Sequence, residues 1–156
     1  MIDVAKLYET DYYQWAKHQA ELLQKNDFLA MDIEHLIEEL EGMARSDKRE
    51  LESRLTVLIT HLLKWQYQRQ TLKEQWQGFD GQSWEKTIIE QRTQLESLLD
   101  KMPSLHPSLE PIVQDAYPYA LKWVIRETRL SKEIFPSHCP YSVNQLLDHD
   151  FYPTFA

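Results

Sequence analysis

An apolar stripe at helical spacing runs through residues 33–65 without a change of phase. Leu, Ile, Met, Ala and Trp recur there at steps of three and four, which is the spacing of one face of an α-helix. The stripe predicts one long helix over about residues 32–70, with Asp32 as its N-terminal cap. Gly42 and the polar pair that begins at Ser46 leave the alternative of two shorter helices open.

The second half of this stripe is apolar around most of the helix. At 100° per residue, the apolar side chains of residues 55–63 span well over half of the helical wheel. Thr56, Thr60 and Lys64 mark the solvent side in this pattern. A helix that is apolar on most of its circumference is normally surrounded by other elements. Residues 51–65 are therefore predicted to be the centre of the fold.

Shorter periodic segments flank this helix along the chain. One helix is predicted from a cap at Thr10 or Asp11 to about residue 26, another begins at Ser83, and a capping box of Ser142 and Gln145 starts a short last helix. No stretch alternates with period two for long, and Gly is rare, which disfavours strands. The predicted fold is all-α, a compact bundle of four to five main helices with one long central helix and a short C-terminal helix. A single helical domain is expected over residues 1–156.

Charge and cysteine content bear on the partners and the compartment. The formal net charge is −8, which opposes phosphate, so we expect no nucleic-acid partner. Purely apolar runs reach at most four residues, whereas a membrane span needs ~20, so we expect no membrane insertion. The single cysteine, Cys139, cannot form an internal disulfide, and the first residues lack the features of a signal peptide. The expected location is cytoplasmic.

Acidic residues gather in the first half of the predicted long helix. Glu34, Glu38 and Glu41 lie about 120° from the apolar stripe, and we interpret them as a solvated face, with a site for a cation or a basic partner as the alternative. Residues 27–52 carry nine acids and three bases, whereas residues 53–73 carry four bases and no acid. This asymmetry suits antiparallel packing or a partner helix, or it is incidental.

Six short stretches form an ordered pattern along nearly the whole chain. They are LYETDYYQW at residues 7–15, LIEELE at 36–41, HLLKWQYQ at 61–68, EQR at 90–92, FPSHCPY at 135–141 and LLDHDFYP at 146–153. The pattern resembles the bacterial family catalogued as domain of unknown function 29. That resemblance implies a small helical protein, in agreement with the periodicity. It implies no catalytic residue, because the family has no assigned chemistry.

Motifs for metals and catalysis are absent from the sequence. No His has a Glu three residues before it, as a di-iron bundle requires, and Asp32 before His35 is explained by the helix cap. Neither His-Glu-x-x-His, nor a phosphate loop, nor a nucleophile elbow occurs. Cys139 is interpreted as a packed residue rather than a nucleophile beside His138, because catalytic Cys–His partners are usually distant in sequence. We therefore predict no metal, no cofactor and no catalytic residue.

A polar ridge follows the edge of the apolar stripe. Asp47, Arg54 and His61 recur every seven residues, so their positions on the wheel drift by only about 20° per step. On the helix predicted after Ser83, the polar residue Gln91 lies within the apolar face, and Arg92 follows it in the sequence. Two interpretations stay open. These residues form either a satisfied internal network that fixes the helix register or a polar pocket between helices.

No motif identifies the function, so hypotheses of different classes remain. The leading hypothesis is a non-enzymatic cytoplasmic interaction module, with an unknown protein partner or self-association through an exposed helical or aromatic face. The alternative is a small-molecule-binding or enzymatic bundle that uses the polar ridge. A third hypothesis is nucleic-acid binding through the basic and aromatic residues of 64–76. Trp65 falls on the buried stripe, which argues against this last hypothesis.

Overall fold

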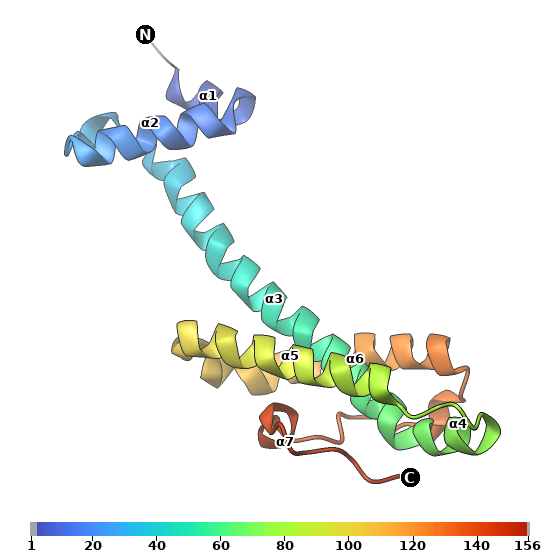
Figure 1. Ribbon diagram of the computed structural model, residues 1–156. Coiled ribbons are helices and arrows are strands. Elements are labelled where there is room, and N and C mark those ends of the chain that lie inside the picture. Colours follow the sequence, from blue (N-terminus) through green and yellow to red (C-terminus); the bar gives the residue numbers. More distant parts are fainter. Residues whose placement is uncertain (1–2, 156) are drawn as a thin grey trace. The chain divides into compact units, whose positions relative to one another are not determined.

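The computed structural model describes residues 3–155, and helices account for most of them (Figure 1). The α-helices are α1 (Val4–Thr10), α2 (Tyr12–Gln24), α3 (Ile33–Tyr67), α4 (Arg69–Gln75), α5 (Gln82–Lys101), α6 (Leu109–Thr128) and α7 (Val143–Leu147). Short 3-10 helices lie at Phe28–Ala30, Pro103–Ser108 and Lys132–Ile134. No strand occurs among these residues. The all-α prediction is confirmed, and four of the helices exceed ten residues.

The long helix predicted from the apolar stripe forms as one element, α3, of 35 residues. Asp32 caps it, since its Oδ1 accepts the backbone N–H of His35 at 3.4 Å. Gly42 and Ser46 both lie inside the helix and do not interrupt it. The alternative of two shorter helices is therefore excluded.

The contacts of the chain divide it into two compact units, Met1–Asp47 and Lys48–Ala156. We refer to them as the N-terminal unit and the C-terminal unit, and each is described by itself. Helix α3 contributes its first residues to the N-terminal unit and the remainder to the C-terminal unit. The expectation of one domain over residues 1–156 stays a prediction.

Helices α1 and α2 of the N-terminal unit meet at Asp11. The Asp11 side chain accepts the backbone N–H of Gln14 at 3.1 Å and so caps α2, as predicted. The Asp11 backbone N–H donates to the carbonyl of Leu7, in the last turn of α1. Helix α1 was not predicted, because seven residues are too few to show a helical period. Trp15 and Leu22 are the apolar residues that α2 buries.

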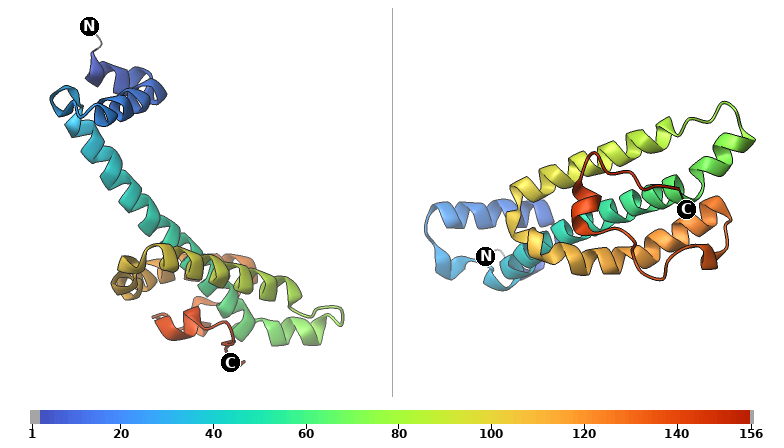
Figure 2. Two further views of the ribbon diagram at one scale, coloured as in Figure 1. Left: turned by 60° about the vertical axis from the view of Figure 1, so that its left-hand side comes forward. Right: turned by 90° about the horizontal axis from the view of Figure 1, so that it is seen from below.

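The core of the C-terminal unit lies between α3, α5 and α6. In Figure 2 (right), α3 lies between α5 and α6, and the segment that contains α7 crosses them. The fully buried apolar residues come from all four helices: Leu51, Leu58, Ile59, Leu62 and Leu63 of α3, Ile88 and Leu95 of α5, Ala116, Ala120 and Val124 of α6, and Leu146 of α7. The prediction that residues 51–65 are central is confirmed.

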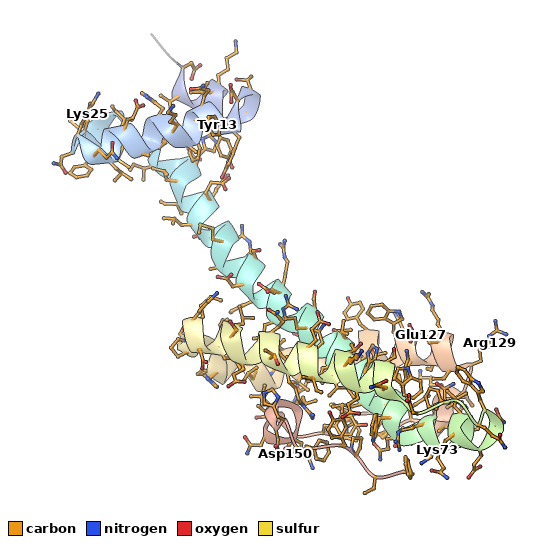
Figure 3. All side chains as sticks on the ribbon, viewed as in Figure 1. Tyr13, Lys25, Lys73, Glu127, Arg129 and Asp150 are labelled. Atoms are coloured by element: carbon orange, nitrogen blue, oxygen red, sulfur yellow. The ribbon has the colours of Figure 1, made fainter. Side chains whose placement is uncertain are left out.

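The predicted solvent side of α3 is buried instead. Thr56, Thr60 and Lys64 are all buried. Each threonine hydroxyl donates to a carbonyl of its own helix, Thr56 to Glu52 at 2.8 Å and Thr60 to Thr56 at 2.7 Å. Lys64 forms an ion pair with Glu127 of α6, which Figure 3 labels. Because these polar groups are satisfied locally, the helix can be enclosed on this side as well.

Of two further predicted helix caps, the one at Ser83 is wrong and the one at Ser142 is confirmed. Helix α5 begins at Gln82 rather than after Ser83, and the residue before it is Gly81 at φ 73°. This left-handed conformation carries no steric cost for glycine, so the backbone turn starts the helix without a side-chain cap. The capping box is confirmed: Ser142 Oγ accepts the N–H of Gln145 at 3.1 Å, and Gln145 Oε1 accepts the N–H of Ser142 at 2.9 Å.

Two leucines of α3 provide a matched test of these environments. Leu58 is 0% exposed, whereas Leu40 is 65% exposed. Leu58→Ala leaves a cavity in the core and is expected to lower the free energy of unfolding by about 2–5 kcal/mol, whereas Leu40→Ala changes it by less than about 0.5 kcal/mol. Urea unfolding followed by circular dichroism measures both. Equal losses in the two variants would contradict this assignment of the core.

Candidate functional site

The structure brings the ridge residue Arg54 together with another predicted site residue, Gln91. Arg54 Nη1 donates to Gln91 Oε1 at 3.4 Å and so joins α3 to α5. Arg54 Nε also donates to Glu50 Oε1 at 3.1 Å, one turn earlier on α3. Asp47 is partly exposed and is the last residue of the N-terminal unit. The Arg54–Gln91 pair is therefore a link between two helices of the C-terminal unit.

His61 makes its hydrogen bond within α3. Its Nδ1 lies 2.8 Å from the carbonyl oxygen of Val57, so Nδ1 carries the proton that is donated. Burial lowers the pKa of His61, and the charge of Lys64 lowers it further, although the bond to Val57 and the charge of Glu127 act in the opposite direction. The ring is therefore neutral near pH 7, with Nε2 as its free acceptor.

Arg92 lies with the C-terminal tail rather than with the ridge. It is 1% exposed, its Nε donates to the carbonyl of Leu146 at 2.9 Å, and its Nη2 donates to the carbonyl of Gln145 at 3.1 Å. These carbonyls belong to the last turn of α7, where a cation is favourable. The guanidinium also lies 5.5 Å from the ring centre of Tyr152. Burial lowers the pKa of Arg92, and it remains charged.

The predicted site residues thus fall into separate groups. Arg54 pairs with Gln91, His61 bonds to its own helix, and Arg92 holds the tail. Each of these contacts is internal, which supports the interpretation as a network that fixes the packing. The polar pocket between helices stays a prediction.

A polar and aromatic cluster in the N-terminal unit was not predicted. Asp32 accepts two side-chain hydrogen bonds, from Trp15 Nε1 at 2.9 Å and from His35 Nδ1 at 2.7 Å. Its backbone N–H donates to Gln19 Oε1 at 2.8 Å. Trp15 and Gln19 are both buried. Asp32 therefore connects α2 to the start of α3 in addition to capping α3.

Glu39 of α3 binds two tyrosines, Tyr8 of α1 and Tyr12 of α2. Its carboxylate accepts the hydroxyls of Tyr8 and Tyr12, the latter at 2.7 Å. The ring of Tyr8 stacks on His35, with ring centres 3.9 Å apart. The hydrogen bond to Glu39 raises the pKa of Tyr8 to about 12, and the same bond lowers the pKa of Glu39. The sequence signal for this cluster is the polar set Asp32, His35 and Glu39, spaced at three and four residues along one side of α3.

Consequently, α3 packs its polar side within the N-terminal unit and leaves its apolar side exposed. At 100° per residue, Ile33, Ile37 and Leu40 lie within about 60° of one another and on the side away from His35. The exposed fractions of Ile33, Ile37 and Leu40 range from 49% to 65%, and Phe28 and Leu29 just before the helix are also exposed. We call these five residues the N-terminal apolar face. Tyr13 of α2, labelled in Figure 3, is a further exposed aromatic residue of this unit.

The basic and aromatic run of residues 64–76 makes internal contacts. Trp65 packs on Tyr152, with ring centres 4.8 Å apart, and the Arg69 guanidinium lies 4.3 Å from the Trp65 ring centre. Gln66 Oε1 accepts the hydroxyl of Tyr141 at 2.7 Å. The ring of Trp65 is therefore engaged with the tail, whereas Trp76 at the end of the run is 62% exposed and contacts Phe79.

The described part of the chain contains neither a cluster of metal ligands nor a helix suited to cross a membrane. No group of three His, Cys, Asp or Glu side chains is placed to hold a metal ion among residues 3–155. In the same range, no helix combines the length and the apolar character that a membrane span requires.

Comparison with known proteins gives one result. A family model described as "Domain of unknown function DUF29" matches residues 7–152. No curated protein and no solved structure gives a match.

The state of His61 is directly testable. Because burial lowers its pKa, the ring is expected to titrate below about 6.5. Its contribution to stability is then present above that pH and is lost as the pH falls through the lowered pKa. His61→Ala is expected to cost about 1–3 kcal/mol at pH 7, whereas His106→Ala, at an exposed position, costs less than about 0.5 kcal/mol. Ring titration by nuclear magnetic resonance and urea unfolding are the measurements. A midpoint at or above 6.5 together with an unchanged stability would show the assignment to be wrong.

His35 is expected to shift in the opposite direction. The hydrogen bond to Asp32 raises its pKa, and the bonds from His35 and Trp15 lower the pKa of Asp32 although desolvation by itself would raise it. The pair therefore stabilises the N-terminal unit most between about pH 4 and 6.5, and the His35 contribution is lost as the pH rises through its raised pKa. Asp32→Asn should lower the titration midpoint of the His35 ring, whereas Asp27→Asn should not. Equal midpoints in the parent and in Asp32→Asn would refute the pairing.

Proposed function

The chain belongs to the DUF29 family, whose description names no activity, and we propose from the geometry that this protein is a non-enzymatic interaction module. The N-terminal apolar face is the binding surface. Its partner is a basic amphipathic helix of another protein, which covers the apolar residues and pairs with the acidic residues beside them.

The observation that carries the proposal is the orientation of α3 in the N-terminal unit. An amphipathic helix normally buries its apolar side. Here Asp32, His35 and Glu39 form the side that packs, through hydrogen bonds to α1 and α2, while Ile37 and Leu40 are exposed. Exposed apolar side chains gathered on one side of a helix are typical of a protein interaction site.

The charge of the unit determines the kind of partner. Residues 1–47 carry eleven acidic and four basic residues, so their net charge of −7 accounts for nearly all of the −8 of the chain. Glu34, Glu38 and Glu41 are exposed beside the apolar face. A basic helix would gain from this charge, whereas a second copy of the unit would bring an equal negative charge against it. Charge therefore favours a basic partner over self-association.

The other hypotheses have less support. The acidic balance opposes nucleic acid, and Trp65, Gln66 and Arg69 of the 64–76 segment contact the tail. The ridge residues Arg54 and His61 make internal hydrogen bonds, which leaves an enzymatic role without a geometric basis. A cytoplasmic location remains part of the proposal because the single Cys139 is a free thiol.

A designed peptide tests the proposal. The probe is an amphipathic helix of Leu and Lys with leucines on one face, and its control has every Lys replaced by Glu. The Leu/Lys peptide is expected to bind the full chain, and Leu40→Ser should weaken that binding at least about tenfold because a polar group then faces the leucines. Ile89→Ser, at an exposed position of α5, is the matched control and should leave affinity unchanged. Fluorescence anisotropy of the labelled peptide gives the affinities.

Three outcomes would overturn the proposal. The first is equal binding of the Glu peptide, because charge would then play no role. The second is the same effect of Leu40→Ser and Ile89→Ser, because the surface would then not be the one assigned. The third is a dimer in sedimentation experiments that Leu40→Ser dissociates, because the apolar face would then be covered by a second copy.

A further inference from the structure

The C-terminal unit contains a cavity that the interaction surface does not use. It has a volume of about 730 Å³ and lies between α6 and the tail segment of residues 137–144. This volume falls within the range of sites that enclose small organic ligands. The tail residues that line it belong largely to the FPSHCPY stretch, for which neither the fold nor the proposed function has accounted.

The inner wall of the cavity is apolar and well ordered by hydrogen bonds. Val113 and Tyr117 of α6 and Tyr141 of the tail line it and are buried. The Tyr117 hydroxyl donates to the carbonyl of Pro136 at 2.6 Å, and the Tyr141 hydroxyl donates to Gln66 at 2.7 Å. Since both hydroxyls are already used, the tyrosines contribute the apolar surface of their rings to the cavity.

Cys139 is part of this wall and not a reactive group. Its thiol is partly buried and lies 3.6 Å from the carbonyl oxygen of Tyr141. Burial raises the pKa of Cys139, so the thiolate form is scarce at neutral pH. The cavity is therefore lined for binding rather than for nucleophilic chemistry.

The outer, exposed part of the lining is polar, and Glu110 is its one acidic side chain. Glu110 and Gln114 of α6 and Asn144 of the tail belong to it, together with His138, whose Nδ1 lies 3.0 Å from Ser137 Oγ. Glu110 forms no ion pair within the described part of the chain, and none of the residues there that line the cavity is Lys or Arg. A ligand anion would thus meet a carboxylate and no cationic side chain that is charged at all pH values, whereas an ammonium group would gain a partner.

We propose that this cavity binds a small organic amine, with its apolar body against Val113, Tyr117 and Tyr141 and its ammonium group paired with Glu110. The amide groups of Gln114 and Asn144 supply further acceptors for the ammonium hydrogens. This site is separate from the N-terminal apolar face, so the two proposals stand or fall independently.

Three probes with the same ring and different head groups test the charge preference. They are 2-phenylethylamine, 2-phenylethanol and phenylacetate, each titrated into the full chain and followed by ¹H–¹⁵N chemical shifts. The amine is expected to shift the amides of Val113, Tyr117 and Cys139 and to bind at least about tenfold more tightly than phenylacetate. Glu110→Gln should remove most of this preference and leave the affinity for 2-phenylethanol unchanged. Glu90→Gln, at an exposed position of α5, is the matched control.

A second variant tests the location. Gln114→Trp places a large side chain at the exposed rim of the cavity, so it should abolish amine binding without a loss of thermal stability. The proposal is overturned if no probe shifts the amides of the lining residues, if phenylacetate binds as tightly as the amine, or if Glu110→Gln has no effect. Leu40→Ser, which tests the interaction surface, should leave amine binding unchanged.

Discussion

The enclosure of α3 from Leu51 to Lys64 is the constraint on which the C-terminal unit depends. A helix enclosed on most of its circumference can bury polar groups only where each has a partner, because an unpaired buried group costs about 1–3 kcal/mol. The threonines of α3 meet this condition within their own helix, and Lys64 meets it through Glu127. Of these pairings, the one between Lys64 and Glu127 joins α3 to α6, whereas α5 and the tail are held to α3 by the apolar core and by separate hydrogen bonds.

The N-terminal unit is held together by a different kind of interaction. Asp32 and Glu39 each accept two side-chain hydrogen bonds from residues on neighbouring turns or helices. Hydrogen bonds in which one partner is charged are shorter and stronger than those between neutral groups. Because the packing relies on carboxylates and aromatic hydroxyls, the aliphatic residues Ile33, Ile37 and Leu40 are not needed for it. They are thereby available to another molecule.

The position of the long helix could be predicted from the sequence, but which of its side chains are buried and what they contact could not. Steps of three and four predicted α3, because that period is a property of the helix alone. The same pattern misassigned Thr60 and Lys64 to solvent, since hydropathy does not show that a hydroxyl can bond within its own helix or that Glu127 lies opposite. For the candidate site, the spacing predicted one group of Asp47, Arg54, His61, Gln91 and Arg92, and the structure joins Arg54 to Gln91 by a hydrogen bond. The contacts of Arg92 had no sequence signal, because the carbonyls that it binds belong to a tail whose position no local pattern encodes.

The contacts of that tail also affect how the C-terminal unit folds. Arg92 meets Leu146 across 54 residues of chain, and Gln66 meets Tyr141 across 75. Closing such long loops costs more entropy than forming a helical turn, and α7 has only five residues, too few to persist by itself. During synthesis, the α3, α5 and α6 segments emerge from the ribosome before the tail that closes over them. The folding rate of the C-terminal unit should therefore depend on how fast these two long-range contacts close.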